Sequence, residues 1–201
     1  MRVVWVRLAA SITLGLLVTA AAAADDLSGP VSFVPWRVLV PGDPPAPSPL
    51  TLFWVPASAD DFKHSEMLFS RQLTAYASQC VAMSVIRADD TSTITRLGVG
   101  GSLPVAVLID GNGKQMGKVD NERGALRVSA VERLVRDRLR AAESDIDTLL
   151  EDARRKTEAG DRAAAVVTYK SIWAVRCIAP RKARTAQREL KKLGVEVAEA
   201  H

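Results

Sequence analysis

The feature that most constrains the fold is an almost uninterrupted apolar run, LTLFWVP, at residues 50–56. Such a run is typical of a strand that is buried on both faces of a sheet. Apolar residues at helical spacing follow over residues 58–79, and a second apolar run follows at residues 81–89. A strand, a helix and another strand in this order predict a parallel pair that is joined by a right-handed crossover.

Three further segments complete the predicted sheet. The segment VSFVPWRVLV at residues 31–40 predicts a first strand, and its proline favours an edge position. VAVLID at residues 105–110 predicts another buried strand, and GNGK predicts a hairpin turn, after which QMGKVDN pairs back. A short helix is expected over residues 91–99. The fold class predicted is therefore α/β, with a mixed sheet flanked by helices.

Helical patterns occupy the rest of the chain. Residues 125–144 carry the apolar stripe of an amphipathic helix. Residues 145–201 contain three more helical segments and no strand signal, with breaks at Gly160, Pro180 and Gly194. This region is predicted to form a small C-terminal α-helical appendage.

The first 24 residues have the pattern of a secretory signal peptide. Arg2 and Arg7 precede an apolar stretch, and small residues at Ala22 and Ala24 suit a cleavage site before Asp25. The alternative is an uncleaved anchor, the one case in which we expect membrane attachment. The predicted organisation is thus a signal peptide at 1–24, an α/β domain at 25–144 and the appendage at 145–201. The protein is expected to be exported, to the periplasm or the extracellular space.

Export also limits the partners. Loss of the two signal-peptide arginines lowers the formal charge from +4 to about +2, and we therefore expect no nucleic-acid partner. No residue pattern predicts a metal site or a cofactor.

The chain has two cysteines, Cys80 and Cys177, both in the exported part. An even number of cysteines in an oxidising compartment favours a disulfide. A Cys80–Cys177 bond would tie the α/β domain to the appendage and stabilise the chain by roughly 4 kcal/mol in the chain-entropy model. The alternative is that Cys80 is a reactive thiol, with Cys177 as its resolving partner.

Several short motifs together resemble the thioredoxin family. Phe53 and Trp54 resemble the end of the strand that leads to the thioredoxin active site, and Leu103-Pro104 before a strand resembles the cis-proline loop. The hairpin around GNGK and the following amphipathic helix fit the same pattern. The resemblance covers residues 31–144 and implies a thioredoxin-like fold.

The resemblance also implies where the catalytic Cys-x-x-Cys pair would lie. Ser58 occupies the position of the first cysteine and Asp61 that of the second. A serine hydroxyl cannot form the mixed disulfide that thiol exchange requires. We therefore assign no catalytic residue and treat Ser58, Asp61 and Pro104 as a degenerate active-site position. The peptide-binding groove of the family could persist there, whereas simple helix capping is the alternative.

The appendage resembles a single tetratricopeptide-like helical hairpin, on the spacing of Gly160, Ala165 and Tyr169. The segment 176–192 holds seven Lys or Arg and one Glu, which indicates either a solvated face or a surface for an acidic partner or anionic membrane. The candidate interaction residues here are Tyr169, Trp173, Arg181 and Lys182.

These observations predict an exported, non-catalytic interaction or scaffold protein that binds another envelope protein or an extended peptide. Two alternatives remain open. One is a thiol-dependent redox protein that uses Cys80 and Cys177, and the other is a holdase-like chaperone.

Overall fold

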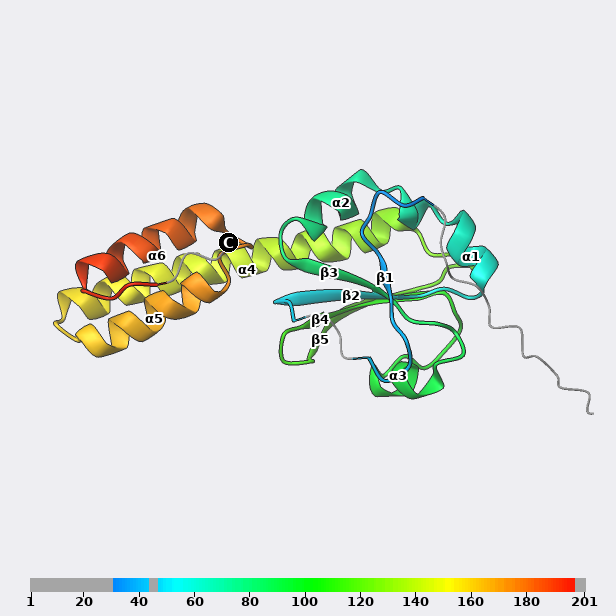
Figure 1. The fold of residues 1–201 in the computed structure, drawn as a ribbon, viewed down its shortest axis with the longest axis horizontal. Coiled ribbons are helices and arrows are strands. Elements are labelled where there is room, and N and C mark those ends of the chain that lie inside the picture. Colours follow the sequence, from blue (N-terminus) through cyan, green and yellow to red (C-terminus); the bar gives the residue numbers. More distant parts are fainter. Residues whose placement is uncertain (1–30, 44–46, 198–201) are drawn as a thin grey trace, which may run out of the picture.

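The computed structural model describes residues 31–43 and 47–197 (Figure 1). The predicted signal peptide and its cleavage point lie outside the described residues. Within the described part, no helix is both long enough and apolar enough to cross a membrane.

Five strands form one mixed sheet in the order β1-β3-β2-β4-β5. β1 and β2 run parallel to β3, whereas β4 runs antiparallel to both β2 and β5. The strands are β1 (Arg37–Val38), β2 (Leu50–Val55), β3 (Val81–Val85), β4 (Val105–Asp110) and β5 (Gln115–Asp120). The predicted fold class is confirmed, because a mixed sheet is flanked by helices and followed by a helical region. The arrangement is compatible with a thioredoxin-like α/β fold.

The sheet has a different core on each face. Leu52 and Trp54 of β2 contribute to a large apolar cluster beneath the helices α2 (Arg71–Ala77) and α4 (Val128–Glu158), which cover one face. Phe53 and Val55 point to the opposite face, where α3 (Thr91–Arg96) covers a smaller cluster. This alternation follows from the two-residue period of a strand. Figure 1 shows α2 and α4 on one side of the sheet and α3 on the other.

The first strand is much shorter than predicted. A strand over residues 31–40 was expected, but only Arg37 and Val38 pair with β3. The backbone N–H groups of Phe33 and Val34 instead donate to the carbonyl of Leu68, at 2.9 and 3.2 Å. Pro35, which has no N–H to donate, follows directly.

The helix expected over residues 58–79 is divided into three. These are α1 (Ala59–His64), a 3₁₀ turn η1 (Glu66–Leu68) and α2. Each begins after a serine whose hydroxyl accepts a hydrogen bond from the first turn, and these serines are Ser58, Ser65 and Ser70. N-cap serines start new helices by satisfying otherwise free N–H groups. The helical spacing of the apolar residues masked these boundaries.

The opposite correction applies to α4. Two helices, 125–144 and 145–160, were expected, but one helix runs from Val128 to Glu158. Ser144 and Asp145 are residue types that favour caps, yet neither caps a helix here, and no Gly or Pro interrupts the span. The boundary predicted at residue 144 therefore falls inside α4.

Helices α5 (Arg162–Ala174) and α6 (Pro180–Lys192) pack against the distal half of α4. We refer to α5 and α6 together as the helical hairpin. Figure 1 shows α4 extending from the sheet to the hairpin, which lies at one end of the molecule, whereas α1 lies at the other end. The main apolar cluster is continuous from the sheet into the hairpin, through Leu139, Ile146 and Leu150 of α4.

Candidate functional site

The turn after β2 places the side chains of Ser58 and Asp61 where each accepts a hydrogen bond from a backbone N–H at the start of α1. The Ser58 hydroxyl accepts a hydrogen bond from the N–H of Asp61 at 3.1 Å. The Asp61 carboxylate in turn accepts one from the N–H of Ala57 at 2.9 Å. The arrangement resembles a capping box, except that the Asp61 carboxylate binds the N–H of the residue before the N-cap. The polar side chains of Ser58 and Asp61 therefore stabilise the start of α1.

A cleft of about 160 Å³ lies beside this turn. Its walls come from the segments that follow the parallel strands β2 and β3, at the carboxyl ends of both. Crevices at the carboxyl ends of parallel strands are the usual ligand sites of open α/β sheets. The lining residues are Pro56, Ala57, Ser58, Ala59, Arg87, Ala88 and Asp89.

An ion pair forms the far wall of the cleft. Arg87 donates to both carboxylate oxygens of Asp89, at 3.0 and 2.8 Å. The hydrogen bond from the guanidinium holds the pKa of Asp89 below its ordinary value. The pair presents one fixed cation and one fixed anion at the edge of the cleft.

Pro104 lies at the same end of the sheet. The Leu103–Pro104 peptide bond is cis, as the family resemblance implied. Val105 pairs with Val55 in the antiparallel ladder between β4 and β2. Pro104, which precedes Val105, therefore lies across from Pro56, which follows Val55. Ser58, Asp61 and Pro104 are therefore brought to one end of the sheet. Pro104 itself is buried and does not line the cleft.

The side chains near the cleft do not form a nucleophile–base pair. The Nδ1 atom of His64 lies 3.0 Å from the carbonyl oxygen of Asp60 and 3.3 Å from its carboxylate. The Ser58 hydroxyl contacts the backbone of Asp61 instead. In the described part of the chain, no group of His, Cys, Asp and Glu is arranged to hold a metal ion.

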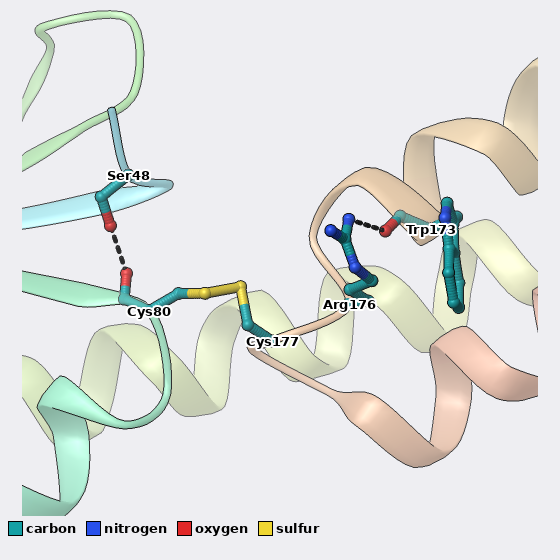
Figure 2. Close-up of a disulfide and its surroundings, with 5 residues drawn as sticks. All are labelled: Ser48, Cys80, Trp173, Arg176 and Cys177. Atoms are coloured by element: carbon teal, nitrogen blue, oxygen red, sulfur yellow. Dashed lines mark hydrogen bonds between the residues drawn. A yellow bond between two sulfur atoms is a disulfide. The ribbon is translucent and has the colours of Figure 1, made fainter. Parts of the chain in front are cut away.

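The two cysteines lie at the other end of the sheet and form a disulfide (Figure 2). Their Cα atoms are 5.6 Å apart although 97 positions separate them in the sequence. Cys80 immediately precedes β3 and has φ +64°, and its carbonyl accepts a hydrogen bond of 2.6 Å from Ser48. Cys177 lies between α5 and α6. The Cys80–Cys177 disulfide predicted from the sequence is therefore present and links the sheet to the helical hairpin.

The four candidate interaction residues of the hairpin are in different environments. Tyr169 is only 1% exposed and packs in the core, which corrects its assignment to an interaction surface. Lys182 is bound to α4, because its ammonium contacts the Asp147 carboxylate at 2.7 Å and the Glu143 carbonyl at 2.9 Å. Trp173 is partly exposed. Arg181 is exposed to solvent.

Arg176, a residue not predicted to contribute here, completes the surroundings of Trp173. Its guanidinium lies 5.3 Å from the Trp173 ring centroid, in a cation–π contact that Figure 2 shows near the disulfide. Trp173 and Arg176 are three positions apart in a segment with a helical pattern, and this spacing could have predicted their contact.

We compared the chain with known proteins. No protein-family model matches it, and a search of curated proteins finds no significant match.

Proposed function

We propose that this protein is an exported, non-catalytic interaction protein with a thioredoxin-like fold, which binds an extended segment of another protein in the cleft beside Ser58. The observation that carries the proposal is that Ser58 and Asp61 both accept backbone hydrogen bonds at the start of α1, from the N–H groups of Asp61 and Ala57 respectively. At the positions where the thioredoxin family has its reactive pair, these two side chains hold the turn in shape. The turn thus keeps a defined cleft without supplying a thiol.

The chemistry of the cleft suits a peptide backbone. Its apolar floor is formed by Pro56, Ala57 and Ala59, and the Arg87–Asp89 pair supplies a charged rim. Extended peptides are commonly held by a small apolar surface together with a few placed polar groups. Export is supported by the Cys80–Cys177 disulfide, since such bonds persist in oxidising compartments.

The binding test uses a matched pair of variants. Random peptides displayed on phage would be selected on the protein, and the selected peptides measured by fluorescence anisotropy. Ala88→Trp fills the cleft and is expected to weaken binding at least tenfold. Ala141→Trp adds the same side chain at an exposed site on α4 and is expected to leave binding within twofold.

Two outcomes would contradict the proposal. Equal loss in both variants would place the peptide elsewhere. Equal binding of unrelated unfolded proteins, with suppressed aggregation, would favour the holdase-like alternative instead.

The resemblance of the C-terminal region to a tetratricopeptide-like helical hairpin supports a scaffold role. The distal half of α4 and α5 form a helical pair joined at Gly160, which has φ +78°. Ala165 and Tyr169, the small and aromatic positions of that pattern, are both buried between the helices. We propose that this region presents a second binding surface.

A thiol-redox role through the disulfide is the second candidate. It is favoured by one observation, a hollow of about 540 Å³ in which Cys177 lies with Arg181, Lys182 and Arg184. Nearby cations lower the pKa of a cysteine thiol and so increase its reactivity. Mass spectrometry after graded reduction and alkylation tests this role. Reduction by mild thiol buffers would support it, whereas a bond that resists them would indicate a structural link.

A further inference from the structure

The outer surface of α6 carries positive charge alone. Ala183, Ala186 and Leu190 are buried and define the inward direction of the helix. The opposite side carries five exposed cations, which we call the basic face: Arg181, Arg184, Arg188, Lys191 and Lys192. Their spacing of three or four residues places them along one side of the helix.

Few acidic groups lie at this face, and one of them, Glu143, lines the same hollow as Arg181 and Arg184. Lys192 pairs with Glu189 at 2.8 Å, and Arg188 donates to the Thr185 hydroxyl at 3.3 Å. Within the described part of the chain, the side chains of Arg181, Arg184 and Lys191 have no hydrogen-bond or ion-pair partner, although the backbone carbonyls of Arg181 and Lys191 accept hydrogen bonds. Residues 162–192 contain nine Lys or Arg and one Glu, a formal charge of 9 − 1 = +8.

This arrangement opposes the stability of α6. Like charges three and four residues apart repel one another on a helix. Positive side chains in the first turn also face the positive end of the helix dipole, and α6 has no acidic residue there and no side-chain cap. Lys191 and Lys192 lie in the last turn, where the helix dipole favours cations. Arg181, Arg184 and Arg188 have no evident role in folding, which indicates a role in binding.

The basic face also lacks the apolar residues of a membrane-surface helix. Such helices combine cations with exposed Trp, Phe or Leu that enter the lipid. The exposed residues of α6 are Pro180 and the five cations of the basic face, and the Ala186 and Leu190 side chains pack in the core. The face therefore suits an acidic protein surface better than a lipid surface.

We propose that the basic face of α6 is a docking surface for an acidic segment of a protein partner. Three of its cations are arginines, whose guanidinium groups bind carboxylates with two parallel hydrogen bonds. Arg181 and Lys192 are separated along the helix by roughly 16 Å. A partner helix with Glu or Asp at every third or fourth position carries carboxylates at the same spacing.

This surface is independent of the cleft beside Ser58. Figure 1 shows α6 and α1 at opposite ends of the molecule, with α4 between them. At 31 residues, α4 spans roughly 46 Å. An acidic partner at the basic face and a peptide in the cleft can therefore be bound simultaneously.

The test uses a fluorescent helical peptide of about 20 residues with Glu at alternating three- and four-residue intervals, and a neutral peptide with Gln in place of Glu. Anisotropy would be measured on the protein expressed from its full sequence. The triple variant Arg181→Gln, Arg184→Gln, Arg188→Gln is expected to bind the acidic peptide at least tenfold more weakly. A matched triple variant, Arg133→Gln, Arg138→Gln, Arg140→Gln, changes the charge equally at exposed sites on α4 and should stay within twofold.

Thermal unfolding of the α6 triple variant provides a second measurement. Because the substitution relieves repulsion, its midpoint should equal or exceed that of the native chain. Each of the following overturns the proposal: a markedly lower midpoint, equal loss of binding in both triple variants, or no preference for the acidic peptide. Binding to phosphatidylglycerol vesicles that the acidic peptide does not reduce would likewise overturn it, in favour of a lipid surface.

Discussion

The sheet and the helical hairpin bury their cores in different ways. The strands contribute large side chains to both faces of the sheet, among them Leu52 and Trp54 on one face and Phe53 on the other. In the hairpin, alanines occupy several of the innermost positions, among them Ala165, Ala183 and Ala186. An alanine removes little apolar area from water, so each contributes less to stability than a buried leucine. The hairpin therefore depends more on its attachments, which are α4 and the disulfide.

The two regions also differ in how the residues that the sequence analysis singled out contribute to the fold. Ser58 and Asp61, at the end of the sheet, cap the start of α1 beside the cleft. The cysteines, at the junction with the hairpin, form a covalent link. Both pairs therefore stabilise the fold, one through local hydrogen bonds and the other through a bond between distant segments.

Removing the disulfide should have the largest effect. Cys80→Ser with Cys177→Ser opens a loop of 97 positions. The expected loss is roughly 4 to 5 kcal/mol in the free energy of unfolding, because the unfolded chain regains entropy. Urea unfolding measures this loss. One transition should remain, since the main core is continuous through α4.

The control is the native protein under reducing conditions, which should reproduce the double variant. Two separate transitions would show that the hairpin is an independent unit. A loss below about 1 kcal/mol would show that the link contributes little to stability.

A matched pair of leucines compares the two cores directly. Leu108 in the sheet and Leu190 in α6 are both 0% exposed. We expect Leu108→Ala to lower stability by about 4 kcal/mol and Leu190→Ala by about 2 kcal/mol. The difference arises because a terminal helix can shift into the vacated space, whereas a central strand is held by neighbours on both sides. Chemical denaturation of both variants checks the ranking, and the reverse order would contradict the comparison.

Helix caps allow a smaller test in each region. Ser58→Ala at α1 and Asp161→Ala at α5 each remove a side-chain acceptor of a first-turn N–H. Each should lower stability by about 1 kcal/mol. Ser129→Ala, at an exposed site in α4 that caps nothing, is the control and should change stability by less than about 0.5 kcal/mol. Ser58→Ala should additionally weaken binding in the cleft, whereas Asp161→Ala should not.

The smallest effect concerns pH. Burial of Asp90 at the start of α3 acts to raise its pKa, but hydrogen bonds from Thr93 and Ser92 outweigh burial and leave the pKa below the ordinary value. A carboxyl whose pKa is lower in the folded state stabilises the fold above its unfolded pKa of about 4. That contribution is lost as the pH falls through the lower, folded value.

Asp90→Asn, which keeps a capping oxygen but does not titrate, should therefore flatten the loss of stability below about pH 4. Asp152, on the part of α4 that packs against the hairpin, can be compared with Asp90. A hydrogen bond from Lys156 lowers the pKa of Asp152, although this pair is more exposed. Added salt should weaken the contribution of Asp152 more than that of Asp90. Thermal midpoints between roughly pH 3 and 6, measured for Asp90→Asn and Asp152→Asn at low and high salt, test both expectations. An unchanged pH profile for Asp90→Asn would refute the assignment.

Local patterns in the sequence predicted many of the individual elements. The apolar runs located β2, β3 and β4, and the Asn-Gly turn located the hairpin between β4 and β5. They also predicted the Cys80–Cys177 pair and the turn at Ser58. Where these predictions failed, local signals competed: the three capping serines divide a segment with continuous helical spacing, and Ser144 and Asp145 suggested a boundary that α4 does not have.

The sequence by itself determined the strands, the turns and the absence of a Cys-x-x-Cys pair, because these depend on residues that are close along the chain. Only the tertiary structure decided that β4 lies beside β2, that Tyr169 is buried and that the cysteines meet across 97 positions. It also decided which side of α6 faces solvent, and hence that the basic face exists. Such features depend on how distant segments pack, and packing is set by the combined burial of many side chains rather than by local pattern.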